Sequence, residues 1–287
     1  MKIGAHMSAA GGYGEALSRV AAIEGNCLQI FSASPRGWNT PKISPADAKK
    51  FVAEKKRLGI DPVYFHASYL INLADAGSTG HLSKKMLIAE LGVAEKAGVR
   101  GSIVHLGSFK DKDDGEIGAQ ENYQTLIKNI KEVLKNAPKD VLFLIEDAGT
   151  RKIGRRIEEI GKIIRDIGDD RLRVCLDTCH LHAAGYDLRT KEKFDDFLKL
   201  FDKEVGLDRL ELFHINDSRD PFGSLRDRHE NIGEGAVGRE VFTLLLNHPK
   251  TRNLSFISET PGFDGNGPDK KNLDILRSLV TDDRKKV

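Results

Sequence analysis

Six short apolar runs in this sequence each end in a histidine, an aspartate or a glutamate. Each run has the length of a β-strand. The six terminal residues are His66, His105, Glu146, Asp177, His214 and Glu259. Imidazole nitrogens and carboxylate oxygens are ligands that zinc, manganese and iron take from proteins. Hydrophobic packing does not require a polar side chain at the same point of every strand, so the pattern indicates a metal cluster.

Three further donors stand close to these strand ends. His180 follows Asp177 by three residues, and Asp227 and His229 form an Asp-x-His pair after the run that ends at His214. The Asp-x-His spacing places both side chains on one face of an extended segment. Together the three residues can hold a third ion. His182 is the alternative to His180, but it stands farther from the strand end.

The nine donors include four carboxylates, which would repel one another without bound cations and raise their own pKa values. Three divalent ions carry about +6 against −4, and a bridging hydroxide leaves about +1, which suits a phosphate group. One strand-end histidine alone is more often a hydrogen-bonded structural residue, and the same holds for one Asp-x-His pair. Recurrence over six runs makes coincidence improbable. His6 ends the first run, and we expect it to support the ligands.

A barrel is the fold that brings all six ends together. The predicted strands are 2–5, 27–31, 62–66, 101–105, 141–146, 172–177, 209–215 and 254–259. The predicted helices are 46–58, with Ser44 as N-cap and Gly59 at its end, 82–98, 119–136, 154–167, 191–204, 238–247 and 271–280. Eight strands alternating with helices over 287 residues are typical of an α/β protein with a (β/α)8 TIM barrel, whose site lies at the C-terminal ends of the strands. An open doubly wound sheet also alternates, but only strands near its switch point reach one site. We expect one barrel domain over residues 1–287.

The composition limits the choice of partners. The net charge of +2, from 45 basic and 43 acidic residues, excludes a strong overall attraction to polyanions, so any nucleic-acid surface must be a local patch. No apolar run approaches the roughly 18 residues of a membrane span, and the N-terminus lacks a signal-peptide core, so we expect a cytoplasmic protein without membrane contact. The three cysteines, Cys27, Cys175 and Cys179, are expected to be unpaired, with Cys27 and Cys175 as small buried hydrophobes.

Longer motifs resemble those of the endonuclease IV family of apurinic/apyrimidinic (AP) site endonucleases. The matching stretches span nearly the whole chain. They are Ile3 to Gly12, Gln29 to Phe31, Pro35 to Trp38, His66 to Leu73, Asp177 to His180 with Ala183 to Asp187, His214 to Ser218, Asp227 to Gly235, and Glu259 to Pro261. A run such as Asp-Arg-His-Glu-Asn-Ile-Gly is highly specific.

The resemblance implies a site with three zinc ions, with manganese or iron as the alternative at one position. By matching position, the first ion is held by His66, His105 and Glu146. Glu146 bridges to a second ion, which is held by Asp177, His214 and Glu259. The third ion is held by His180, Asp227 and His229.

The resemblance also implies an activity in base excision repair. The family cuts double-stranded DNA on the 5′ side of an abasic site and leaves a 3′-hydroxyl and a 5′-deoxyribose phosphate. Attack by a metal-bridged hydroxide is the expected mechanism, and the candidate catalytic carboxylates are Glu146 and Glu259, either of which can orient the hydroxide. We expect the protein to act as a monomer.

Residues expected to bind DNA lie on loops beside the metal ligands. Tyr69 and Leu70 match the family's wedge, which enters the base stack and helps to flip out the abasic nucleotide. Arg36 matches a DNA-binding loop, and Arg228 flanks a ligand. The alternatives are that the wedge residues pack into the local core and that the arginines are merely solvated. A cluster of basic residues also follows Glu146, namely Arg151, Lys152, Arg155 and Arg156.

The chain departs from the family pattern after the fifth strand, where Glu146-Asp147-Ala148-Gly149 is one residue shorter than usual. This departure removes no ligand, but it adds the charge of Asp147. Two other functions remain open. A sugar isomerase or epimerase of the same barrel superfamily would need a single metal site, and a non-catalytic binder of damaged DNA would need no complete ligand set.

Overall fold

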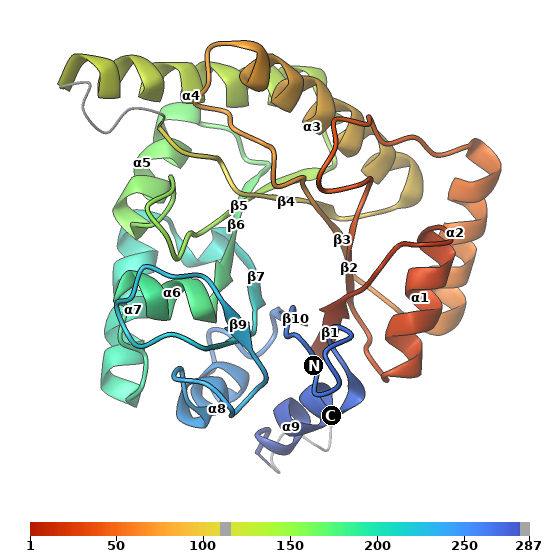
Figure 1. The fold of residues 1–287 in the computed structure, drawn as a ribbon, viewed down its shortest axis with the longest axis vertical. Coiled ribbons are helices and arrows are strands. Elements are labelled where there is room, and N and C mark those ends of the chain that lie inside the picture. Colours follow the sequence, from red (N-terminus) through yellow and green to blue (C-terminus); the bar gives the residue numbers. More distant parts are fainter. Residues whose placement is uncertain (110–115, 282–287) are drawn as a thin grey trace.

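Eight parallel strands close into a barrel in the computed structural model, which describes residues 1–109 and 116–281 (Figure 1). The barrel strands are β1 Lys2–His6, β2 Leu28–Phe31, β3 Val63–His66, β4 Gly101–Val104, β5 Leu142–Glu146, β6 Leu172–Asp177, β7 Leu210–His214 and β10 Ser255–Ser258. Strand β1 pairs with both β10 and β2, which completes the ring. The expected TIM barrel is confirmed, and each strand lies within one residue of its predicted ends.

Helices surround the strands on the outside of the barrel (Figure 1). They are α1 Tyr13–Ala22, α2 Pro45–Leu58, α3 Ser78–Ala97, α4 Glu116–Asn136, α5 Ile157–Ile167, α6 Thr178–Ala184, α7 Lys191–Glu204, α8 Arg239–Asn247 and α9 Lys270–Ser278, with a short 3₁₀ helix at Leu207–Arg209. Within the described residues, no helix combines the length and the apolar character that crossing a bilayer requires.

Local sequence signals set the ends of the helices. Ser44 caps α2 by accepting a hydrogen bond from the Asp47 backbone N–H, and Gly59 ends the helix in the left-handed conformation, as predicted. The prediction for α5 was wrong at its start, because Gly154 has a φ of 92° and Arg156 is extended. The helix therefore begins at Ile157 instead of residue 154.

Three features of the fold lie outside the predicted elements. Helix α1 buries only Ala16, Leu17 and Val20, a short apolar pattern. Helix α6 is seven residues long and begins immediately after β6. Strands β8 Asp217–Ser218 and β9 His229–Glu230 form a two-stranded antiparallel sheet, too short to leave an alternating pattern.

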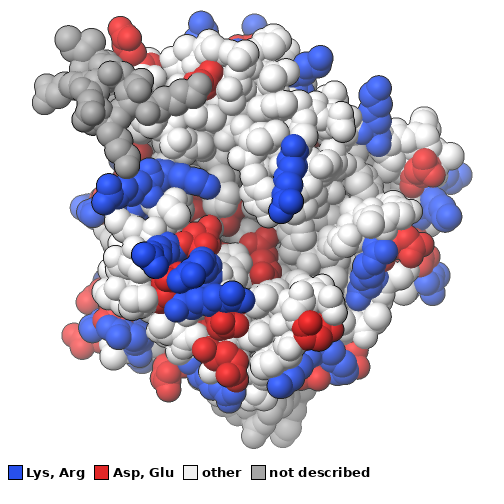
Figure 2. All heavy atoms as spheres, viewed as in Figure 1, with Lys and Arg blue, Asp and Glu red and all other residues white. Residues whose placement is uncertain are grey.

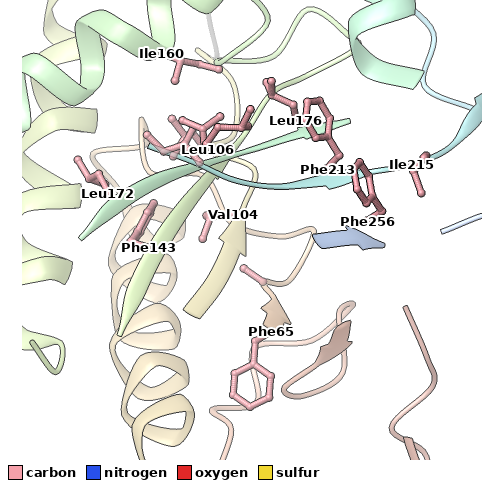
Figure 3. Close-up of a cluster of buried hydrophobic side chains, with 14 of the residues drawn as sticks. Phe65, Val104, Leu106, Phe143, Ile160, Leu172, Leu176, Phe213, Ile215 and Phe256 are labelled. Carbon is pink, nitrogen blue, oxygen red and sulfur yellow. The ribbon is translucent and has the colours of Figure 1, made fainter. Parts of the chain in front are cut away.

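Two groups of buried apolar side chains hold the barrel in shape. The larger lies between strands and helices and includes Phe143 of β5, Leu172 of β6 and Ile160 of α5 (Figure 3). The smaller contains Tyr64 and two of the cysteines, Cys27 and Cys175. All three cysteines are free and buried, and burial was predicted for Cys27 and Cys175. The packed strands give the polar residues at their C-terminal ends a rigid support.

Close contact between β1 and the start of β2 depends on Gly4. A Cβ atom at this position would lie 1.8 Å from the Cys27 carbonyl oxygen. We expect Gly4→Ala to lower the free energy of unfolding by about 1–3 kcal/mol or more, because the strands must separate. Gly92→Ala in α3 is the control, since an added Cβ there meets nothing within 4 Å. Chemical denaturation at fixed zinc concentration measures both, and equal stability of the two variants would contradict this packing.

Candidate metal centre

The barrel brings the nine predicted donors to one mouth. His66, Glu146, Asp177 and His214 are the last residues of β3, β5, β6 and β7. His105 and Glu259 each follow the last residue of a strand, β4 and β10. His180 lies in the first turn of α6, and His229 begins β9. The structure groups these nine side chains into three sets whose ligand atoms lie within 4.8 Å of one another.

The first set contains His66, His105 and Glu146. Oε2 of Glu146 lies 3.1 Å from Nε2 of His66 and 3.3 Å from Nε2 of His105. The other ring nitrogen of His66, Nδ1, is 2.7 Å from the Ala67 backbone oxygen, to which it donates. That hydrogen bond leaves Nε2 of His66 with a lone pair directed at the mouth.

The second set contains Glu146, Asp177, His214 and Glu259. Oε1 of Glu146 lies 2.9 Å from Nδ1 of His214, so the two oxygens of this carboxylate face different sets. Nδ1 of His214 is also 3.5 Å from Oε2 of Glu259 and 3.8 Å from Oδ2 of Asp177. Glu146 is therefore positioned to bridge two ions.

The third set contains His180, Asp227 and His229. The two oxygens of Asp227 lie 3.1 Å from Nε2 of His180 and 3.3 Å from Nε2 of His229. His182 points elsewhere, because its Nε2 is 3.2 Å from the Asp220 backbone oxygen. The choice of His180 over His182 therefore agrees with the geometry.

Several neighbours hold the donors in place, and sequence reasoning gave most of them no role. Nδ2 of Asn216 donates to Asp177, and Oδ1 of Asn216 accepts from the Glu259 backbone N–H, both at 2.7 Å. Nδ1 of His6 lies 3.2 Å from Oε1 of Glu259, consistent with the expected supporting role. Asn216 lies two residues beyond the end of β7, within the His214 to Ser218 stretch that resembles the family.

The loop after β5 also supports the centre. The buried carboxylate of Asp147 accepts a hydrogen bond from the Asp177 backbone N–H, and its backbone oxygen is 2.9 Å from Nδ1 of His180. Burial raises the pKa of Asp147 well above its usual value. The residue that marks the departure from the family pattern therefore contacts two predicted ligands.

Charges within the mouth compensate one another in the metal-free protein. Burial raises the pKa of Glu146 and of Glu259, but neighbouring imidazoles outweigh this effect and hold both pKa values below the usual range. Burial opposes protonation of His229, yet Asp177 and Asp227 raise its pKa to about 9. Burial also lowers the pKa of His105, in this case to about 4.

The residues fit bound divalent cations. Nε2 of His229, which faces Asp227 in the third set, is buried without a hydrogen-bond partner, which is costly unless another ligand satisfies it. The three sets combine imidazoles with carboxylates, the donor chemistry of zinc, manganese and iron sites. Asp177, Cys179 and His229 form a further overlapping group, but burial raises the pKa of the Cys179 thiol to about 12.

The predicted wedge residues lie at the mouth of the barrel. Tyr69 is 62% exposed, and its ring centre lies 5.3 Å from that of Phe31 and 6.1 Å from that of His66. Leu70 is partly exposed. Tyr69 is therefore not folded into the core and stands next to a predicted ligand.

The predicted basic contacts are exposed as well. Arg36 is exposed on the loop after β2, and Arg228 is exposed while its guanidinium donates to both oxygens of Asp220. Arg151, Lys152 and Arg156 are exposed after β5. Figure 2 shows acidic side chains near the centre of this face, with lysine and arginine side chains around them.

Comparisons with known proteins agree with this architecture. The family model described as a xylose isomerase-like TIM barrel matches residues 17–279. A probable endonuclease 4 from Halothermothrix orenii is 37% identical, over 96% of this chain and 99% of the relative. The crystal structure of endonuclease IV from Thermus thermophilus is 32% identical and has a TM-score of 0.84, covering 97% of this chain and 98% of that one.

Similarity to another solved structure is lower in sequence identity and shows only that the fold is shared. A D-tagatose 3-epimerase-like protein is 19% identical with a TM-score of 0.71, over 97% of each chain. The family match and the relatives above define a barrel of the xylose isomerase-like class. Within that class, the chain belongs to the endonuclease IV family.

Metal binding to the third set should depend on pH. His229, with a pKa of about 9, is protonated at pH 7 in the metal-free protein, whereas His105, with a pKa of about 4, is neutral. Because an ion binds only the neutral imidazole, its binding must displace the His229 proton. We expect zinc affinity to rise with pH up to about 9, with proton release measurable by calorimetry in buffers of different ionisation enthalpy. Proton-free, pH-independent binding between pH 6 and 8 would contradict this assignment.

Proposed function

We propose that the protein is a zinc-dependent endonuclease of base excision repair. In this proposal it cuts double-stranded DNA on the 5′ side of abasic sites and leaves a 3′-hydroxyl and a 5′-deoxyribose phosphate. The observation that carries the proposal is the arrangement of nine donors in three sets at one barrel mouth, with Glu146 shared between two sets. Family membership supports the nuclease activity, since the relatives named above are endonucleases or probable endonucleases.

The residues divide the work between binding ions and handling protons. Bound divalent ions would supply an activated water and neutralise the charge that develops on the phosphate and on the leaving 3′ oxygen. Glu146 and Glu259 hold pKa values below the usual range, so both are carboxylates at neutral pH. Each can therefore accept a hydrogen bond from water and orient it toward the phosphorus atom.

The cysteines do not suit nucleophilic catalysis. Burial raises the pKa values of Cys27, Cys175 and Cys179 to about 12, so their thiols are protonated at neutral pH. This chemistry favours direct attack by water over a covalent intermediate on a thiol.

The surface around the mouth suits a duplex with a gap in its base stack. The exposed ring of Tyr69, with Leu70 beside it, can fill the space that a missing base leaves. Arg36, Arg228 and the basic residues after β5 can contact phosphates. One chain carries all of these groups, which supports a monomer as the active form.

A single-metal sugar epimerase is the second candidate, and the resemblance in fold alone favours it. Such an enzyme has no need of the third set, formed by His180, Asp227 and His229. The number of ions bound per chain separates the two functions, since one ion supports the epimerase.

Cleavage of a duplex with a single abasic analogue tests the proposed activity. We expect one nick on the 5′ side of the lesion, its loss after strong chelation, and its recovery when zinc is restored. His66→Ala should reduce cleavage by at least about 100-fold, because a ligand set becomes incomplete. His81→Ala is the matched control, since His81 is exposed and outside the sets. Failure of the zinc-loaded protein to nick this duplex would reject the proposal.

Tyr69→Ala should weaken recognition of the lesion without loss of zinc. Removal of a stacking ring is expected to lower affinity for abasic duplex about 10-fold or more, measured by fluorescence anisotropy with a non-cleavable abasic analogue and zinc-loaded protein. Tyr123→Ala serves as control, because Tyr123 lies on α4 and bonds to Asp166 on the outside of the barrel. If the Tyr69→Ala variant binds abasic duplex as tightly as the unaltered protein, Tyr69 does not act as a wedge in the base stack.

A further inference from the structure

Gln29 is a buried polar residue within the otherwise apolar strand β2. Its side chain has no exposed surface, and it reaches three residues of the mouth: His6, His214 and Glu259. An amide group has two hydrogens to donate and one oxygen to accept, so it can satisfy all three at once.

The carboxylate of Glu259 fixes the orientation of this amide. An ionised carboxylate only accepts hydrogen bonds, so the Gln29 Nε2 group must face Oε1 of Glu259. Nε2 of Gln29 also lies 2.8 Å from Nδ1 of His6, an atom that is itself 3.2 Å from the same Glu259 oxygen, so the three groups stand in mutual contact. Oε1 of Gln29 consequently faces Nε2 of His214, at 2.7 Å.

This orientation determines which nitrogen of His214 can bind an ion. Since the Gln29 oxygen only accepts, Nε2 of His214 must carry a hydrogen. The lone pair available to a metal is therefore on Nδ1. That atom is the one directed at Oε1 of Glu146, Oε2 of Glu259 and Oδ2 of Asp177.

We propose that Gln29 is the positioning residue of the second ligand set. It holds His214 in the Nε2–H tautomer with Nδ1 toward the ion, and it holds Oε1 of Glu259 so that Oε2 faces the same point. The inference rests on the metal binding proposed above, but not on nuclease activity. No other common side chain of this length supplies both donors and an acceptor: glutamate would repel Glu259, and methionine offers neither.

Gln29→Met tests this role, because methionine keeps the length of the side chain and removes its hydrogen bonds. Zinc retained against a competing chelator should fall from about three ions to about two, as the affinity of the second set drops about 10- to 100-fold. The matched control is Tyr64→Phe on β3. Tyr64 pairs in register with Gln29, is equally buried, and bonds instead to Glu211.

The tautomer of His214 provides a second readout on the unaltered protein. In the zinc-loaded protein labelled with ¹⁵N-histidine, the ring of His214 should show a hydrogen on Nε2 and a metal-type shift on Nδ1. A metal-type shift on Nε2, or a Gln29→Met protein that keeps three ions with unaltered affinity, would overturn the inference. If the unaltered protein holds no zinc, the proposed centre fails and this inference fails with it. If the unaltered protein binds all three ions but does not cleave abasic DNA, the proposed nuclease activity is rejected and the inference about Gln29 is not.

Discussion

Burial of the Glu146 carboxylate at the centre of the mouth is the constraint on which the site depends. Its side chain is 1% exposed, and its oxygens face His66 and His105 on one side and His214 on the other. A buried carboxylate is stable only when positive charge or donated hydrogen bonds surround it. In the metal-free protein the imidazoles supply that compensation, and bound cations would supply it more strongly.

The barrel makes this concentration of charge possible because its strands end at one rim. Packed apolar side chains fix the strands, and donors on neighbouring strands, level in register or offset by two residues, then stand a few ångströms apart. Hydrogen bonds with Asn216, Asp147 and Gln29 restrict the metal-binding side chains further. The third set lies entirely outside the barrel strands, on α6, the loop before β9 and β9 itself.

The sequence predicted the strands and their polar ends because both follow from local pattern. An apolar run with a terminal His66 or Asp177 can be read directly, and eight predicted strands, six of them with such an end, indicate closure. The role of Gln29 could not be read, since its partners lie 23, 185 and 230 residues away along the chain. The role of Asp147 was equally hidden, because its contacts with β6 and α6 arise only when the loop is folded.

Zinc-edge anomalous diffraction from crystals of the zinc-loaded protein tests the central claim most directly. The account predicts three peaks, one within each set of donors, with the Glu146 carboxylate between the first two. A single peak, or peaks away from His66, His214 and His229, would contradict it.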